Sequence, residues 1–293
     1  MLSAALEEWL VPKAALVAAI TGRAPSALAR LWLSAIEHEL GAAVRDVAWV
    51  RVGFGVVGSF EVEGGQRLAS KIARSPRPQL ERRLAVREVW RSRGVPSPEL
   101  VAGPFPVGDA FALLERRFTG GVIPVGPDAL AQHFATLVRA GRGTAEPLSA
   151  LGPSWFSGLA PDRVFPRAPV LAASPPEPGL LAWLEPVARR ARALRRPITD
   201  DAIVAHFDFR AEHLRAAEDG ELACVFDLDS LHRDHLPVAL GCAAHAFCAA
   251  APTFDPPSIE AMHAFTERVR RDLALPWSRA DAQLAGAAAH PLR

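Results

Sequence analysis

The stretch HFDFRAEH at residues 206–213, together with CVFDLDS at residues 224–230, decides the fold of this chain. An Asp-Gly pair at residues 219–220 lies between the two segments and is typical of a tight turn. The second segment is an apolar strand that ends in an acid. A short hairpin of this kind returns the chain on itself, so we expect three side chains to converge at one end of it: Asp208, His213 and Asp227.

These side chains have complementary chemistry. Asp208 is expected to accept the proton of an attacking hydroxyl, or to orient that hydroxyl. His213 and Asp227 are candidate ligands for a Mg²⁺ ion that bridges nucleotide phosphates, and Asp229 is a possible auxiliary metal or substrate contact. Aspartates also serve as caps and turn residues. That alternative explains any one of these acids but not their joint placement.

A glycine-rich stretch, GFGVVGSFEV, occupies residues 53–62. Such spacing alone is a weak signal, because it occurs by chance and in two structural contexts. Here residues 59–62 read as a strand and a tight turn at residues 63–66 follows, which indicates a hairpin rather than the start of a helix. In a hairpin over nucleotide phosphates, backbone N–H groups approach the oxygens; an ordinary hairpin with bulge glycines is equally consistent. The candidate phosphate contacts are Gly53, Gly55, Gly58 and Ser59.

A lysine follows on the next predicted strand. The sequence LASK at residues 68–71 matches a strand signature in which the lysine neutralises nucleotide phosphates. A solvated edge-strand lysine is the commoner reading of any single lysine. Lys71 and Lys13 are the only lysines in a chain that otherwise uses arginine, which favours a specific role for Lys71.

The order of these features resembles the aminoglycoside phosphotransferase family, which also includes choline-kinase-like and homoserine-kinase-like members. The resemblance runs from about Val47 to Phe247. It rests on the motifs above, on a helix that ends in GVPSP (residues 94–98) and on a strand ALLE (residues 112–115).

The resemblance implies an α+β, protein-kinase-like, two-lobed fold. Residues 1–117 would form N-terminal helices and a nucleotide-binding lobe with a small β-sheet and one main helix. Residues 118–293 would form a mostly helical lobe with the catalytic hairpin and the acceptor site. ATP would bind near a hinge at Glu115–Phe118, with Glu115 among its contacts, and its γ-phosphate would pass to a hydroxyl of an antibiotic or metabolite.

Three positions depart from the family pattern. Phe207 stands where a glycine is usual. His213 stands where an asparagine is usual, and because Mg²⁺ prefers oxygen ligands the imidazole would weaken Mg²⁺ binding or shift the preference towards Mn²⁺; macrolide kinases resemble this chain in having a histidine there. The helix glutamate expected to pair with Lys71 falls near Arg83, with Glu81 and Glu88 on either side. A nucleotide-binding protein without catalysis is therefore the rival hypothesis, and a homoserine- or choline-kinase-like enzyme is a third.

Composition limits the remaining possibilities. The 293 residues are half hydrophobic, enough for a sizeable core, and the net charge of +1 gives no reason to expect a nucleic-acid partner. Three cysteines, an odd number, favour a reducing compartment over a disulfide framework. No apolar run reaches membrane-spanning length and no secretory leader is evident, so we expect a cytoplasmic protein without a membrane partner. The sequence does not indicate an oligomeric state.

The periodicity of the chain predicts its regular elements. Seven prolines between residues 153 and 178 predict an ordered or semi-ordered loop. A choline-type substrate would require aromatic faces near the acceptor site, and Trp155, Phe156 and Trp183 are candidates to supply them. We expect helices within residues 1–45 and over residues 80–93, 127–140, 180–194 and 259–273, and strands over residues 47–52, 56–62, 67–73, 110–116, 203–207 and 222–226.

Overall fold

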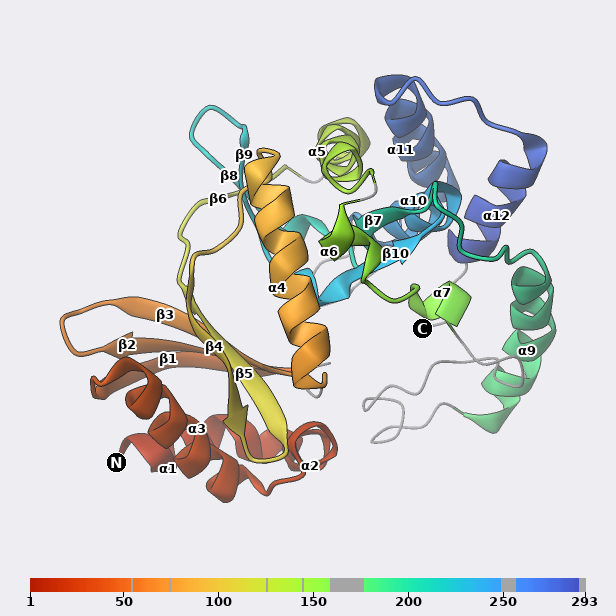
Figure 1. Cartoon of the computed structure of the whole chain (residues 1–293). Helices are drawn as coiled ribbons and strands as arrows, with labels where there is room; N and C mark the ends of the chain where they lie inside the picture. Colours follow the sequence, from red (N-terminus) through yellow and green to blue (C-terminus); the bar gives the residue numbers. More distant parts are fainter. Residues whose placement is uncertain are drawn as a thin grey trace. The chain divides into compact units, whose positions relative to one another are not determined.

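The computed structural model describes residues 1–53, 55–73, 75–124, 126–143, 145–158, 177–248 and 257–289 (Figure 1). The chain divides into two compact units, and each is described by itself. The first contains Met1–Glu81 and Pro98–Thr119. The second contains Arg82–Ser97, residues 120–158 and the described residues from Pro178 onward.

The first unit is built on a five-stranded antiparallel sheet in the order β1-β2-β3-β5-β4. The predicted hairpin joins β2 to β3. Its turn includes Gly64 and Gly65, whose φ angles of 87° and 77° lie in the left-handed region that favours glycine. The strands are β1 (Val44–Val52), β2 (Val56–Val62), β3 (Arg67–Ala73), β4 (Leu100–Val107) and β5 (Ala110–Arg116).

Three helices share a hydrophobic core with one face of this sheet: α1 (Leu2–Leu10), α2 (Ala14–Thr21) and α3 (Pro25–Leu40). A one-turn 3-10 helix (Val11–Lys13) links α1 to α2. The Trp32 ring of α3 packs edge-on against Phe60 of β2 at 5.0 Å, and its indole N–H donates to the Ser70 hydroxyl at 2.9 Å. Because side chains alternate along a strand, residues 57, 59, 69 and 71 lie on the opposite face.

Helix α4 (Arg77–Ser92) belongs to the second unit from Arg82 onward. Its Val86 and Trp90 are fully buried in the core of that unit. Gly94, with φ 83°, ends the helical segment as the sequence predicts. Beyond it, the carbonyl of Pro96 accepts a hydrogen bond from the Val225 amide at 2.9 Å. The end of α4 is thus attached to the strand that precedes Asp227.

The second unit combines helices with two small antiparallel sheets, β10-β7 and β6-β8-β9. Its core includes Phe134, Phe209, Phe247 and Phe265, with the last two rings stacked at 4.8 Å. The helices are α5 (Pro127–Ala140), α6 (Glu146–Ser149), α7 (Trp155–Gly158), α9 (Pro178–Ala193), α10 (Leu236–Ala246), α11 (Ile259–Asp272) and α12 (Arg279–Ala289). The strands are β6 (Gly121–Val122), β7 (Ile203–His206), β8 (Leu214–Ala216), β9 (Leu222–Val225) and β10 (Leu231–Asp234).

The observed elements confirm the α+β expectation and differ from the sequence-based ones in detail. Strand β4 was not predicted, because Pro104 and Pro106 interrupt its pattern; it lies at the edge of the sheet, where proline costs no ladder hydrogen bond. A short helix, α7, lies within the predicted proline-rich loop, of which residues 159–176 are outside the described residues. Across the part of the chain that is described, no helix is long and apolar enough to cross a bilayer.

The approach of α5 to β7 can be tested at Gly141. A Cβ atom there would lie 1.7 Å from the carbonyl oxygen of Val204, so Gly141→Ala must displace the strand that leads to Asp208. Overpacking of this kind costs about 2 kcal/mol, and the midpoint of thermal unfolding should fall by about 5 °C. The matched control is Gly152→Ala, because a Cβ at Gly152 meets nothing within 4 Å. Equal melting temperatures for the two variants would contradict this packing.

Candidate active site

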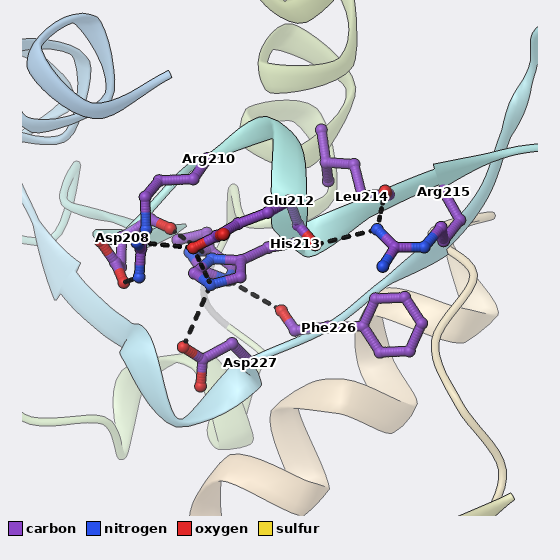
Figure 2. A network of polar contacts seen from close by, with 9 residues as sticks. Asp208, Arg210, Glu212, His213, Leu214, Arg215, Phe226 and Asp227 are labelled. Carbon is purple, nitrogen blue, oxygen red and sulfur yellow. Dashed lines mark hydrogen bonds and ion pairs between the residues drawn. The ribbon is translucent and has the colours of Figure 1, made fainter. Parts of the chain in front are cut away.

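The hairpin read from the sequence is present in the second unit. Strand β7 ends at His206, a 3-10 helix (Ala211–His213) follows, and β8 and β9 then pair antiparallel with Leu214 opposite Val225. The Phe226 amide donates to the carbonyl of His213 at 2.7 Å, which holds the two ends of the hairpin together. Figure 2 shows the side chains that gather there.

The structure brings together Asp208, His213 and Asp227. Each offers one ligand atom, and these three atoms lie within 4.8 Å of one another. All three side chains are between 12% and 22% exposed, so they are sheltered but reachable. Within the described ranges, no other group of three such residues is as close. Asp229, the fourth predicted residue, lies outside this cluster.

The hydrogen bonds of His213 determine which of its nitrogens faces the cluster. Its Nδ1 lies 2.8 Å from the carbonyl oxygen of Asp208, which can only accept, so Nδ1 carries the hydrogen. In the neutral ring Nε2 therefore holds a lone pair, and it lies 3.5 Å from Oδ2 of Asp227 (Figure 2). Burial, together with the neighbouring His206, lowers the pKa of His213 to about 3. At neutral pH the Nε2 lone pair of His213 and the carboxylate of Asp227 thus face each other, and both are hydrogen-bond acceptors. A cation would stabilise this arrangement.

Asp227 has an unusual backbone. Its φ and ψ of 59° and 42° are left-handed, and among the described non-glycine residues only Ala274 also has a positive φ. Aspartate tolerates this region better than most residues. The conformation turns the chain directly from β9 into a 3-10 helix (Leu228–Ser230), whose Ser230 amide donates to the Asp227 carbonyl at 3.1 Å. Strain of this kind gathers at functional sites.

Two further residues, His206 and Phe207, support the cluster. His206 is fully buried, and its Nε2 lies 3.0 Å from the carbonyl oxygen of Phe226, so Nε2 donates there. Phe207 is buried in the core and packs edge-on against the ring of His232 at 5.8 Å. A large residue at position 207 therefore fills the core of this unit, and the departure from glycine leaves the hairpin intact.

Sequence reasoning missed Arg210 and Glu212. Arg210 donates from Nη2 to Oδ2 of Asp208 at 2.8 Å, and its Nη1 lies 2.6 Å from Oε1 of Glu212. All three side chains are at least three-quarters buried, so this pairing is less screened than a surface ion pair. Arg210 holds the Asp208 carboxylate in a fixed orientation. The available signal was its position in the motif itself, two residues after Asp208.

In the first unit, three of the predicted nucleotide contacts share one face of the sheet. Ser59 pairs with Ala69 of β3, Ala69 pairs with Glu115 of β5, and Lys71 lies two residues along β3. This is the face opposite the helices α1–α3. Ser59 is buried, and its hydroxyl accepts a hydrogen bond from Arg117 at 3.3 Å, which gives it a partner within the protein.

The three predicted glycines have different surroundings. A Cβ at Gly55 would lie 2.8 Å from the carbonyl oxygen of Ile72 and 3.5 Å from Cε of Lys71, so this glycine lets the loop pass close to the lysine strand. A Cβ at Gly58 would lie 2.8 Å from the Phe60 ring and 2.9 Å from Trp32, so packing against α3 accounts for a glycine there. Gly53 lies in open space, and Phe54 is outside the described residues.

The glutamates of α4 engage arginines of the same helix. Glu88 is 62% exposed and lies 3.7 Å from Arg87 and 3.6 Å from Arg91, whereas Glu81 pairs with Arg77 at 2.9 Å. The position where the resemblance places a glutamate partner for Lys71 is instead occupied by Arg83, which is buried.

Comparison with solved structures identifies the fold. A macrolide 2′-phosphotransferase of type I is 12% identical with a TM-score of 0.58, over 89% of this chain and 88% of its own. An aminoglycoside-3′-phosphotransferase of type VIII is 17% identical with a TM-score of 0.57, over 87% and 97%. The amicoumacin kinase hAmiN, solved with AMP-PNP and Ca²⁺, is 12% identical with a TM-score of 0.56, over 78% and 72%. The chain has the protein-kinase-like fold of these phosphotransferases. No family model and no curated protein sequence matches it.

The site should make the protein sensitive to acid. Burial, and next the charge of Arg83, lower the pKa of His232 to about 4, and that of His213 is about 3. Below pH 6.5 the unfolded chain binds protons that the folded chain does not, so stability falls as the pH falls towards 4, by up to about 1.4 kcal/mol per pH unit for each imidazole. Denaturant titrations should show a shallower fall for His232→Gln. The control, His38→Gln at an exposed position, should follow the parent, and identical profiles for all three proteins would refute the assignment.

Proposed function

We propose that this protein is an ATP-dependent phosphotransferase that moves the γ-phosphate to a hydroxyl of a small molecule, an antibiotic or a metabolite. The observation that carries the proposal is the convergence of Asp208, His213 and Asp227 at one end of the β8–β9 hairpin. The fold, shared with phosphotransferases that act on small molecules, supports it.

Asp208 would act on the acceptor. Its carboxylate would accept the proton of the attacking hydroxyl or orient it, as catalysis of this kind requires a proton acceptor within hydrogen-bond reach. The ion pair with Arg210 orients the carboxylate.

His213 and Asp227 would hold a divalent cation. The residues present fit such an ion, because the Nε2 lone pair of His213 and a carboxylate oxygen of Asp227 face each other at 3.5 Å. When bound, the ion would neutralise negative charge on the nucleotide phosphates. Mg²⁺ is the expected ion, and the imidazole nitrogen makes Mn²⁺ a competent alternative.

The nucleotide would contact the first unit. Lys71 would neutralise phosphate oxygens, Glu115 would lie towards the hinge, and the loop that includes Gly53, Gly55 and Gly58 would cover the phosphates, with Ser59 beside it. The shared sheet face of Lys71, Ser59 and Glu115 supports this assignment. Glu88 and Asp229 remain candidate members of the site, although each has an arginine neighbour of its own.

We propose that the acceptor is a small hydroxylated molecule and that the protein acts in the cytoplasm. We expect neither nucleic acid nor a membrane as a partner of the protein. The three cysteines are free, as a reducing compartment requires. A choline-type acceptor is less favoured, because the guanidinium of Arg195 already lies 5.8 Å above the Phe156 ring, next to Trp155. The side chain of Trp183 is outside the described residues.

Loss of the proposed base should abolish transfer. Asp208→Asn keeps the size of the side chain but removes its charge, so ADP release in the presence of an acceptor should fall by at least about 100-fold. Acceptors would come from a panel of hydroxyl-bearing antibiotics and metabolites. The matched control is Asp219→Asn at the exposed hairpin turn, which should retain full activity. Undiminished turnover in the Asp208 variant would refute the proposal, and nucleotide binding without any transfer by the parent protein would favour a non-catalytic module.

The histidine ligand should set the metal preference. His213→Asn supplies an oxygen in place of the imidazole nitrogen, so the ratio of activity with Mn²⁺ to activity with Mg²⁺ should fall roughly tenfold. Activity would be measured over a titration of each ion. His263→Asn, on the exposed side of α11, is the control and should keep the parental ratio. An unchanged ratio in the His213 variant would show that position 213 does not contact the ion.

A further inference from the structure

The side chain of Arg215 binds the backbone on both sides of the candidate metal ligand His213 (Figure 2). Its Nη1 donates to the carbonyl of Glu212 at 2.9 Å and to the carbonyl of Leu214 at 2.7 Å. One guanidinium nitrogen of this kind carries two hydrogens, so it can serve both acceptors. The carbonyl between them, that of His213 itself, accepts a hydrogen bond from the Phe226 amide at 2.7 Å. The segment around the imidazole is thus bound at three successive carbonyls.

The same guanidinium lies over the ring of Phe226, the residue that precedes Asp227. Its Cζ is 5.2 Å from the centroid of the ring, which is within the range of a cation–π contact. The amide of Phe226 donates to His213, and its carbonyl lies 3.0 Å from Nε2 of His206, which donates to it. Phe226 is therefore held at its amide, at its carbonyl and at its ring, and Arg215 provides the ring contact.

The backbone of Asp227 depends on neighbours that are held in this way. Its φ of 59° lies in the left-handed region, and such a conformation persists only where the surrounding contacts enforce it. A change of this backbone towards the extended region would alter the direction of the Asp227 carboxylate relative to Nε2 of His213. The contacts of Phe226, directly before it, oppose that change.

An irregularity in the sheet lies beside Arg215. On β8, Arg215 pairs with Cys224 of β9, and the next residue, Ala216, pairs with Leu222, so Ala223 is an extra residue on β9. A bulge of this kind bends the strand and re-aims the side chains next to it. An arginine suits the position, because its planar group can donate hydrogen bonds at its edge while its face lies on an aromatic ring, which the compact ammonium of a lysine cannot do.

We propose that Arg215 is a positioning residue that fixes His213 and Asp227 relative to each other. It bonds the backbone on either side of His213 and stacks on the residue before Asp227. The inference rests on the proposed function, since it takes these two side chains as the ligands of the divalent cation. Arg215 is not itself a ligand, because a protonated guanidinium has no lone pair to offer a cation.

The sign of the effect on metal binding tests the proposal. Binding of Mn²⁺ alone would be measured on the full chain by electron paramagnetic resonance. If Arg215 acted only through its charge, it would repel the cation, so Arg215→Met would tighten binding. If it positions the ligands, the same variant should weaken binding roughly tenfold, as the loss of a contact that orients a metal ligand does. Unchanged or tighter binding would overturn the proposal.

A conservative variant and a matched control accompany this measurement. Arg215→Lys keeps the charge but not the stacked plane, so its Kd for Mn²⁺ should lie between those of the parent and of Arg215→Met. If Arg215→Met fails to fold, Arg215→Lys carries the test, and parental binding by that variant would overturn the proposal. The control is Arg270→Met, because Arg270 of α11 lies over the Trp277 ring at 5.3 Å in a similar contact. It should leave the Kd for Mn²⁺ unchanged.

The link through the ring is tested by a double-mutant cycle. Phe226→Leu removes the aromatic ring alone, so it should also weaken Mn²⁺ binding. Combined with Arg215→Met, it should weaken binding by less than the product of the two single effects, because both variants break the same contact. A loss equal to that product would show that the arginine does not act through Phe226.

Amide exchange separates this inference from the proposed function. The Phe226 amide, which donates to the His213 carbonyl, should exchange at least about tenfold faster in Arg215→Met than in the parent, and an unchanged rate would overturn the positioning role. If the parent binds no Mn²⁺, the proposed metal site is refuted, and the exchange rate alone decides on Arg215. A parent that binds Mn²⁺ but transfers no phosphate would refute the phosphotransferase, while the binding and exchange results still decide on Arg215.

Discussion

The hydrogen bond between Nδ1 of His213 and the backbone carbonyl of Asp208 is the contact on which the site depends. It joins the first and last residues of the segment Asp208–His213, and because a carbonyl can only accept, it also fixes the tautomer of the imidazole. The lone pair on Nε2 is therefore directed at Asp227 by the backbone and not by a side chain that could rotate away. Burial keeps the ring neutral, so in the proposed metal site a proton would not compete with the ion for Nε2 at neutral pH.

The surroundings make this arrangement rigid. Phe207 and Phe209, on either side of Asp208, are buried in the core, and the Phe207 amide donates to the carbonyl of Ser230 at 3.0 Å. The backbone of Asp208 is therefore held between two anchored residues. The Phe226 carbonyl, held by His206, restrains the residue before Asp227 in the same way. Preorganised polar groups of this kind are what phosphoryl transfer demands of a protein, since the chemistry depends mainly on position and charge.

Much of this could be predicted from the sequence, for reasons that are local. The hairpin at residues 206–230 was visible because turn residues, strand residues and acids follow each other without interruption, and the β2–β3 hairpin was visible for the same reason. What could not be predicted depends on contacts between distant segments. Gly58 has the spacing of a phosphate loop, yet the Trp32 ring, 26 positions earlier in the chain, explains its lack of a side chain. The burial of Arg83 likewise follows from the rotation of α4 against the core, which periodicity did not resolve because arginines occur on both sides of that helix.

The charges around the hairpin give a consistent picture of its ligand. Asp208, Glu212, Asp227 and Asp229 bring four carboxylates, while Arg83 and Arg210 bring two guanidiniums. Burial keeps His213 and His232 neutral at neutral pH, so within this set the carboxylates outnumber the guanidiniums by two. The proposed divalent cation would balance that excess. An asparagine at position 213 would leave the net charge of this set unchanged. The imidazole therefore changes the type of donor atom, from oxygen to nitrogen, and not the charge of the set. The histidine at position 213 is for this reason compatible with the proposed phosphoryl transfer.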